Sequence, residues 1–178
     1  ATVALGIEMG LSFNTIKKGI SNYNGVRRRF EIKGIYNNIM VVDDYAHHPS
    51  EIKATLKAAA HGWDRRIIAV FQPHLFSRTK RFFKEFADAL QNADEILITD
   101  IYPARELPIT GVSSKIIYNE LNHKSNGNCI LLNDLDEMIQ TLEEIVKPGD
   151  MVLTMGAGNI WRYSDKYLNH IKKNQIEI

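Results

Sequence analysis

The sequence is poor in cysteine, has no excess of either charge and contains no long apolar run. Cys129 is the single cysteine, which excludes an intrachain disulfide and a disulfide-based fold. Lys and Arg number 22 against 21 Asp and Glu, a net charge of +1, so we do not expect a nucleic-acid binder that acts through a general basic field. No apolar run approaches the roughly 18–20 residues of a membrane span. No basic segment precedes the apolar residues at the start, as one would in a signal peptide, and we expect a cytoplasmic protein that does not contact a membrane.

The length of 178 residues suits one domain, or one domain with a fragment of another. Apolar residues recur at helical intervals from Val3 to Leu11, and Asn14 is a suitable N-cap for a second helix over residues 15–22. We therefore expect a small helical segment at the N-terminus. It is too short to be a domain, and its boundary should fall near residues 25–34.

From residue 30 onward, strand patterns alternate with helix patterns. Asn37 and Asn38 predict a turn between the first two strands. Five apolar strands that are each followed by a helix are typical of an open, mostly parallel α/β sheet. We predict a Rossmann-like sheet with helices on both faces and the first strand at an edge. The expected strands cover residues 30–35, 39–42, 67–71, 96–99, 129–132 and 151–155, and the expected helices cover 49–60, 77–91, 112–122, 135–145 and 159–172.

Polar side chains and glycines follow four of the predicted strands. In an open parallel sheet, ligands bind outside the carboxyl ends of the strands, so we expect these segments to form one site. His47 and His48 are adjacent and point in different directions, so at most one should face a ligand. The glycines at 156 and 158 lack the third glycine of a dinucleotide fingerprint and the lysine of a P-loop, which favours tight strand-to-helix packing. The four segments are residues 43–49, 72–78, 100–106 and 156–159.

These residues leave three classes of function open. A metal-dependent phosphohydrolase could use Asp43, Asp44, His47, His74 and Asp100 as ligands for one or two ions. A nucleotide- or carboxylate-binding domain could use Asp44 for a ribose hydroxyl pair and arginines for anions. In a pure interaction domain the polar edge would be coincidental. Metal that stays bound during purification would favour the first class, and nucleotide binding that survives chelation would favour the second.

Several segments resemble those of the Mur ligases of peptidoglycan synthesis. Two of them are GVRRRFE at 25–31 and DDYAHHPSE at 43–51. FQPHLFSRT at 71–79 and DIYPARE at 100–106 resemble the branch of this family that joins L-alanine to UDP-N-acetylmuramate, and GAGNI at 156–160 also fits. A related branch, which recycles the murein tripeptide, has a similar DD-aromatic-AHHP pattern but lacks the segment at 71–79. It is the alternative within the family.

The resemblance implies a three-domain enzyme of which this chain is one part. Residues 1–29 resemble the helical tail of the central ATP-binding domain, and residues 30–178 resemble the C-terminal Mur ligase domain. The full enzyme would use ATP and Mg²⁺ to turn the muramyl carboxylate into an acyl phosphate, which the amino group of L-alanine attacks. No Gly-x-x-Gly-Lys-Thr/Ser segment occurs in this sequence, so we expect the chain to be inactive without the other domains.

On the nucleotide side, the resemblance implies that Arg29 contacts the nucleotide and that Asp44 accepts hydrogen bonds from the ribose hydroxyls. Tyr45 and His47 resemble residues that line the site between the nucleotide and the amino acid. Asn159 stands where many relatives have Asp, so this chain lacks that negative charge in its glycine loop.

On the amino-acid side, His47, His74 and Arg78 resemble residues that bind the substrate. Because Arg78 lies near a predicted helix start, we expect the helix to add a favourable partial charge for the carboxylate of the amino acid. Leu75 stands where some relatives have Arg, which removes one charge from this position. The resemblance assigns no metal ligand and no catalytic residue to this chain.

Overall fold

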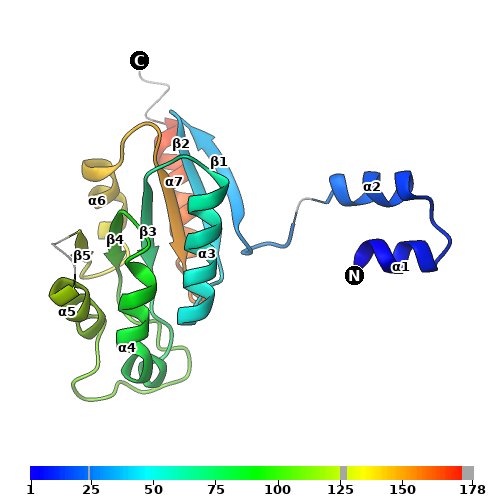
Figure 1. Ribbon diagram of the computed structural model, residues 1–178. Coiled ribbons are helices and arrows are strands. Elements are labelled where there is room, and N and C mark those ends of the chain that lie inside the picture. Colours follow the sequence, from blue (N-terminus) through cyan, green and yellow to red (C-terminus); the bar gives the residue numbers. More distant parts are fainter. Residues whose placement is uncertain (24, 125–127, 174–178) are drawn as a thin grey trace.

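The computed structural model describes residues 1–23, 25–124 and 128–173, and its main feature is a six-stranded sheet (Figure 1). The order across the sheet is β1-β2-β6-β3-β4-β5. β1 pairs antiparallel with β2, and all the other neighbours are parallel. The prediction of a mostly parallel sheet with its first strand at an edge is confirmed. The strands are β1 (Glu31–Tyr36), β2 (Ile39–Asp44), β3 (Ile67–Phe71), β4 (Glu95–Ile98), β5 (Cys129–Leu131) and β6 (Met151–Met155).

The β1–β2 hairpin is closed by the turn that the sequence predicts. Asn37 and Asn38 have φ values of 49° and 57°, and two consecutive positive φ values are what a two-residue type I′ turn requires. Asparagine tolerates this conformation better than most residues do. Tyr36 pairs with Ile39 beside the turn, which sets the register of β1 on β2.

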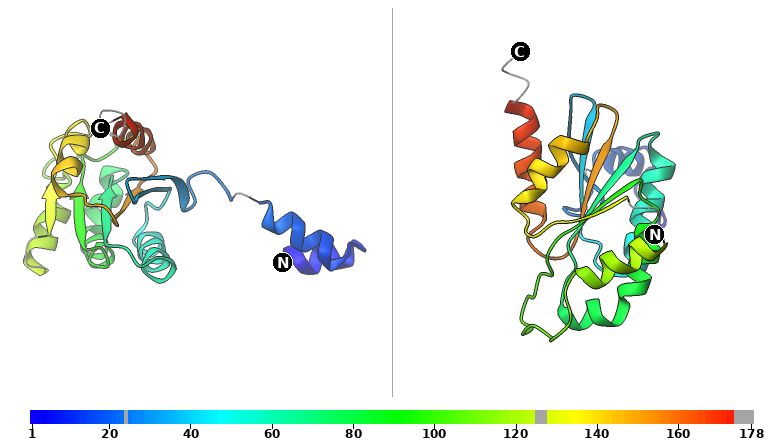
Figure 2. Two further views of the ribbon diagram at one scale, coloured as in Figure 1. Left: turned by 90° about the horizontal axis from the view of Figure 1, so that it is seen from above. Right: turned by 90° about the vertical axis from the view of Figure 1, so that its left-hand side faces the viewer.

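Helices cover both faces of the sheet, as predicted (Figure 2). α3, α4 and α5 bury apolar residues against one face, and α6 and α7 bury theirs against the other. In β3, residues 67, 69 and 71 belong to the first core, and residues 68 and 70 belong to the second. A strand that is buried on both faces has to be apolar throughout, which explains its uninterrupted apolar run. These helices are α3 (Pro49–Gly62), α4 (Phe76–Leu90), α5 (Lys115–Lys124), α6 (Glu137–Ile145) and α7 (Trp161–Lys173).

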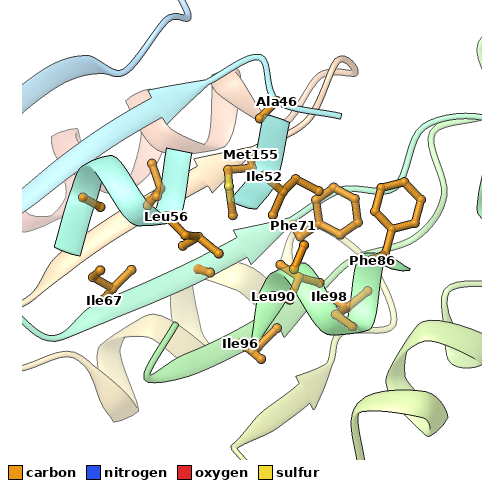
Figure 3. Packing of buried hydrophobic residues seen from close by; sticks show 14 of the residues in the cluster. Ala46, Ile52, Leu56, Ile67, Phe71, Phe86, Leu90, Ile96, Ile98 and Met155 are labelled. Atoms are coloured by element: carbon orange, nitrogen blue, oxygen red, sulfur yellow. The ribbon is translucent and has the colours of Figure 1, made fainter. Parts of the chain in front are cut away.

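The larger core lies between the sheet and helices α3 and α4 (Figure 3). Ile52 and Leu56 of α3 and Phe86 and Leu90 of α4 are fully buried in the same cluster as Phe71 of β3. Full burial of one such side chain stabilises the fold by roughly 1.5–3 kcal/mol. This packing holds the C-terminal half of α4 against the end of β3, where the polar loop begins.

The N-terminal helices α1 (Thr2–Glu8) and α2 (Phe13–Ser21) pack on each other and lie apart from the sheet (Figures 1 and 2). Two details correct the sequence prediction. α1 ends before Leu11 because Gly10 adopts a left-handed φ of 76°. The N-cap of α2 is Ser12 and not Asn14, since the Ser12 hydroxyl accepts the N–H of Thr15 at 3.2 Å.

Two helices begin two residues later than the sequence predicts. α6 starts at Glu137 rather than residue 135, because Asp134 Oδ1 accepts the N–H groups of Asp136 and Glu137 and holds the chain in a turn. α7 starts at Trp161 rather than residue 159.

Within the described ranges, no helix combines the length and the apolar character that crossing a membrane requires.

Candidate functional site at the carboxyl edge of the sheet

The loops that follow β2, β3, β4 and β6 meet at one edge of the sheet, as expected for parallel strands. The N–H of Gln72 donates to the carbonyl of Met155 at 2.9 Å, and that of Tyr102 donates to the carbonyl of Pro73 at 2.8 Å. The Gln72 side chain also donates to Asn159 Oδ1 at 2.9 Å. These hydrogen bonds connect the loops after β3, β4 and β6 into one platform.

Two glycines allow the loop after β6 to come this close. At Gly156, where φ is 155°, an added Cβ would lie 2.9 Å from the carbonyl oxygen of Gln72. At Gly158, a Cβ would lie 2.6 Å from Cγ of Tyr102 and closer still to Oε1 of Gln72. Real Cβ atoms do not approach other heavy atoms so closely. The glycine segment therefore serves close packing, as the sequence predicts.

Asp43 faces the interior and pairs with Arg28. Its carboxylate is buried, accepts the Thr154 hydroxyl at 2.8 Å and lies 3.0 Å from Nε of Arg28. Arg28 also donates to the carbonyl of Gly156 at 2.5 Å, and its guanidinium lies 4.9 Å from the centre of the Tyr45 ring. Burial raises the pKa of Asp43, and the hydrogen bonds from Thr154 and Arg28 partly offset that rise. Arg28 thus connects the segment that precedes β1 to the carboxyl edge of the sheet.

Asp44 organises the backbone around it. Its Oδ2 accepts the N–H of Phe30 and its Oδ1 accepts the N–H of Ala46, each at 2.7 Å. Because each carboxylate oxygen carries two lone pairs, one acceptor position on each oxygen is left for a ligand. Asp44 is 7% exposed, whereas the neighbouring Tyr45 is 38% exposed. The carboxylate is therefore held firmly at the rim, with Tyr45 projecting beside it.

His47 and His48 point in different directions, as predicted. The His48 ring packs against Phe82 with 5.0 Å between the ring centroids, and its backbone begins α3. The His47 ring lies 5.1 Å from the Tyr45 ring and 5.9 Å from the His74 ring. His47 therefore joins the group that includes Tyr45 and His74, and His48 belongs to the packing of α3.

Arg29 lies outside this group of contacts. Its side chain is exposed, and it is the neighbouring Arg28 that contacts Tyr45. The Arg29 charge acts on Glu51 in the first turn of α3. Burial alone would raise the pKa of Glu51, but the backbone N–H groups of His47 and His48 and the charges of His47 and Arg29 hold it below its ordinary value.

His74 and Arg78 carry the polar atoms whose environment is most unusual. The His74 ring is stacked on the Tyr102 ring with 5.7 Å between centroids and 16° between planes. Among the residues that the structure describes, His74 Nδ1 and Arg78 Nη1 are the buried side-chain nitrogen or oxygen atoms without a hydrogen-bond partner. Burial and then the charge of Arg78 lower the pKa of His74, so the ring is neutral at pH 7. Buried polar atoms without a partner are rare, and a ligand that supplies the partners is the physical explanation we favour.

The start of α4 differs from the sequence prediction. The N–H of Ser77, in its first turn, is not available to a substrate anion, because the carboxylate of Glu106 accepts it at 2.9 Å and also accepts the Ser77 hydroxyl. The N-cap residue, Leu75, has a left-handed φ of 73° and contributes no side-chain cap. Glu106 therefore compensates the positive end of the helix, and the expected partial charge near Arg78 is already neutralised.

The metal-ligand set that the sequence left open does not form. Within the described residues, no three His, Cys, Asp or Glu side chains lie close enough together to hold a metal ion. Asp43 is paired with Arg28, and Asp44 is bonded to the backbone. The described residues therefore do not form the ligand set on which the interpretation as a metal-dependent phosphohydrolase depends, a set that also included His74 and Asp100.

Four residues of the site have no role in the sequence prediction, namely Arg28, Gln72, Tyr102 and Glu106. The sequence contains a partial signal for Gln72 and Tyr102, since both follow a predicted strand on the expected edge. It contains none for Glu106, which lies 29 residues from its partner Ser77. Choosing Arg28 over its two arginine neighbours requires the backbone geometry.

This fold and this set of residues define a known class of domain. The family model described as "Mur ligase, glutamate ligase domain" matches residues 28–158. The chain belongs to the Mur ligase family.

Relatives with known names narrow the similarity further. The chain is 44% identical over 173 residues to UDP-N-acetylmuramate–L-alanine ligase of Geobacter sp. and 47% identical over 169 residues to the enzyme of the same name from Acetivibrio thermocellus. These alignments cover 97% and 94% of this chain but 38% and 36% of those proteins. The chain therefore spans little more than a third of the length of these relatives.

Solved structures agree with this similarity. The crystal structure of UDP-N-acetylmuramate-alanine ligase from Thermotoga maritima matches with a TM-score of 0.81 and 28% identity, over 97% of this chain and 36% of that one. A murein peptide ligase from Psychrobacter arcticus matches with a TM-score of 0.69 and 27% identity, over 95% of this chain and 35% of that one.

Proposed function

We propose that the full-length protein is an ATP-dependent ligase that joins L-alanine to UDP-N-acetylmuramate, and that this chain closes over the nucleotide and binds the amino acid. The names of the relatives support this function, as does the higher TM-score of the alanine ligase compared with the murein peptide ligase. The observation that carries the proposal is the pair of buried nitrogens without partners, His74 Nδ1 and Arg78 Nη1.

The amino-acid side of the site consists of His47, His74 and Arg78. L-Alanine is small and zwitterionic, so its carboxylate is the strong handle that leaves the amine free to react. A guanidinium matches a carboxylate in bidentate geometry, and Arg78 has a buried N–H group to offer. Neutral His74 provides a ring nitrogen that can accept a hydrogen bond from the amine, and His47 lies next to it.

The nucleotide side consists of Arg29, Asp44 and Tyr45. The two free acceptor positions of Asp44 suit a pair of ribose hydroxyls, and Tyr45 offers an exposed ring beside them. Arg29 has an exposed guanidinium one residue away from Phe30, which is bonded to Asp44. These residues would hold the nucleotide from this side and leave most phosphate contacts to other domains.

The reaction that this assignment implies is acyl activation followed by aminolysis. ATP converts the muramyl carboxylate into an acyl phosphate, and the amine of L-alanine attacks it to give the amide, ADP and phosphate. Mg²⁺ would neutralise charge on the phosphates, and we propose that residues outside this chain hold it, since the described residues contain no metal-binding cluster. This chain orients the amine and the nucleotide, and we expect it to be inactive alone because it contains no phosphate-binding loop sequence.

We further propose that residues 1–29 are the tail of the central ATP-binding domain and that residues 30–178 are the C-terminal domain. The family model begins at residue 28, which supports this boundary. Leu5 in α1, its C-cap residue Met9 and Phe13 in α2 are 63–69% exposed. Such a concentration of exposed apolar side chains on two short helices favours burial against further protein.

Steady-state kinetics of the full-length enzyme tests both sides of the site. Arg78→Lys should raise the KM for L-alanine by roughly 10- to 150-fold, the equivalent of about 1.5–3 kcal/mol for a charged hydrogen bond, with little change for ATP. Asp44→Asn should instead act mainly on the KM for ATP. Arg81→Lys, on the same helix but stacked on Phe82, is the matched control and should change neither.

The similarity to a murein peptide ligase makes murein tripeptide ligation the second candidate. An enzyme that uses the tripeptide in place of L-alanine would establish that alternative. Equal effects of Arg78→Lys on the KM values for L-alanine and ATP would indicate a structural arginine, and no effect on either would remove Arg78 from the site.

A further inference from the structure

The loop between β4 and α5 is attached to the start of α4 at two places. At the first, Tyr102 donates its N–H to Pro73, accepts the N–H of Leu75 at 3.0 Å and stacks its ring on His74. At the second, Glu106 accepts hydrogen bonds from Ser77. The loop therefore contacts His74 through Tyr102, and it contacts Ser77, which directly precedes Arg78, through Glu106.

Glu106 has a role that α4 cannot fill from its own sequence. The N-cap residue is Leu75, and the first turn contains no acidic residue. An α-helix leaves four N–H groups at its start without an internal partner, and Asp, Asn, Ser or Thr normally cap them. Here the cap comes from the carboxylate of Glu106, which lies on another loop. Hydrogen bonds from the Ser77 side chain and backbone lower the pKa of Glu106, so it is ionised at neutral pH.

The backbone conformation of Leu75 also depends on the attachment of this loop. A non-glycine residue at a φ of 73° is strained and keeps that conformation where its surroundings hold it. Tyr102 holds the N–H of Leu75 on one side, and the Thr79 hydroxyl donates to its carbonyl at 2.8 Å on the other. Releasing the loop would allow Leu75 to relax, and His74 and Arg78, on either side of it, would lose their relative placement.

We propose that Glu106 is a positioning residue for amino-acid binding, which fastens the β4–α5 loop to α4 and so holds Tyr102, His74 and Arg78 in place before the substrate arrives. This inference rests on the proposed function. Under this proposal two residues have separate roles at the start of α4. Glu106 caps the helix N-terminus, and Arg78 binds the carboxylate of the substrate.

Glu106→Gln in the full-length enzyme tests the proposal, because it keeps the shape and removes the charge. The KM for L-alanine should rise roughly 10-fold, the effect of weakening one charged hydrogen bond, while the KM values for ATP and UDP-N-acetylmuramate stay nearly unchanged. Ser77→Ala should raise the KM for L-alanine less. The double variant should raise the KM for L-alanine by less than the product of the two single effects, since both changes weaken the same contact.

Glu137→Gln is the matched control. Like Glu106, Glu137 accepts one backbone and one side-chain hydrogen bond from a single residue, here the two N–H groups of Asn133, and these bonds lower its pKa; but Glu137 lies on α6. It should leave all three KM values unchanged. An equal rise of the three KM values in Glu106→Gln, or no rise in any, overturns the inference while the proposed function stands. If the wild-type enzyme shows no turnover that depends on L-alanine, the proposed function fails, and the inference fails with it.

Discussion

Replacing Gly158 with alanine places a methyl group where the loops after β3, β4 and β6 meet. The new Cβ would lie 2.6 Å from Cγ and 2.8 Å from Cβ of Tyr102. Tyr102 cannot rotate these inner atoms away, because its backbone is bonded to Pro73 and Leu75. The nearby Gln72 amide is also bound, since it donates to Asn159. Overpacking of this kind costs about 1–3 kcal/mol, and we expect Gly158→Ala to lower the free energy of unfolding by that amount.

Urea unfolding followed by circular dichroism measures this loss, and Gly62→Ala provides the control. Gly62 ends α3, has an ordinary backbone conformation, and an added Cβ would meet nothing within 4 Å. Its replacement should be neutral or stabilising by up to about 1 kcal/mol, because alanine favours the helix. If Gly158→Ala unfolds at the same urea concentration as Gly62→Ala, the packing at this edge is looser than the structure indicates.

Two further predictions concern the body of the domain. Leu56→Ala removes a fully buried side chain and should lower the free energy of unfolding by about 2–5 kcal/mol, whereas Leu5→Ala, which changes a side chain that is 63% exposed, should leave it nearly unchanged in the same urea experiment. Burial raises the pKa of the Cys129 thiol to about 12, so this thiol should not react with DTNB at about pH 8 until the chain unfolds. Rapid labelling of the folded chain would contradict the burial of Cys129.

The strands and their arrangement could be predicted from the sequence because their signals are local and strong. β3 is apolar throughout, as a strand covered on both faces must be. Asn37 and Asn38 favour the left-handed backbone that the hairpin needs. The N-cap of α2 could not be chosen reliably, because Ser12 and Asn14 are both good caps two residues apart. Which one begins the helix depends on where Gly10 turns the chain.

The position of the candidate site could also be predicted, but its internal contacts could not. Parallel strands bring their carboxyl ends together, so the sequence predicts His47 and His74 on one edge. Asp43 pairs with Arg28, which the sequence does not distinguish from Arg29. The cap that Glu106 provides for α4 joins two loops across 29 residues and leaves no local pattern. Such contacts depend on the packing of whole elements.

The pairing of Arg28 with Asp43 leads to a last prediction, which concerns pH. The Asp43 side chain is 1% exposed and that of Arg28 is 20% exposed. Arg28→Met keeps much of the apolar stem but removes the charge, so the pKa of Asp43, already raised by burial, rises further in the folded state. A carboxylate whose pKa is raised on folding stabilises the fold below its unfolded pKa, and this stabilisation is lost as the pH rises through the folded pKa. The destabilisation by Arg28→Met should therefore grow from about pH 4 to about pH 7.

At about pH 7 the loss should reach roughly 1.5–3 kcal/mol, below the 3–5 kcal/mol typical of fully buried pairs, because Arg28 is partly solvated. At about pH 4 the raised pKa leaves Asp43 less charged than at about pH 7, so more of the remaining loss comes from the hydrogen bond to the Gly156 carbonyl, which does not titrate. Arg27→Met removes an exposed neighbouring charge and should cost little at either pH. Urea unfolding of both variants at the two pH values separates these cases. A loss in Arg28→Met that is the same at both pH values would mean that Asp43 is stabilised by Thr154 and its other surroundings, and that Arg28 holds the loop through Gly156 alone.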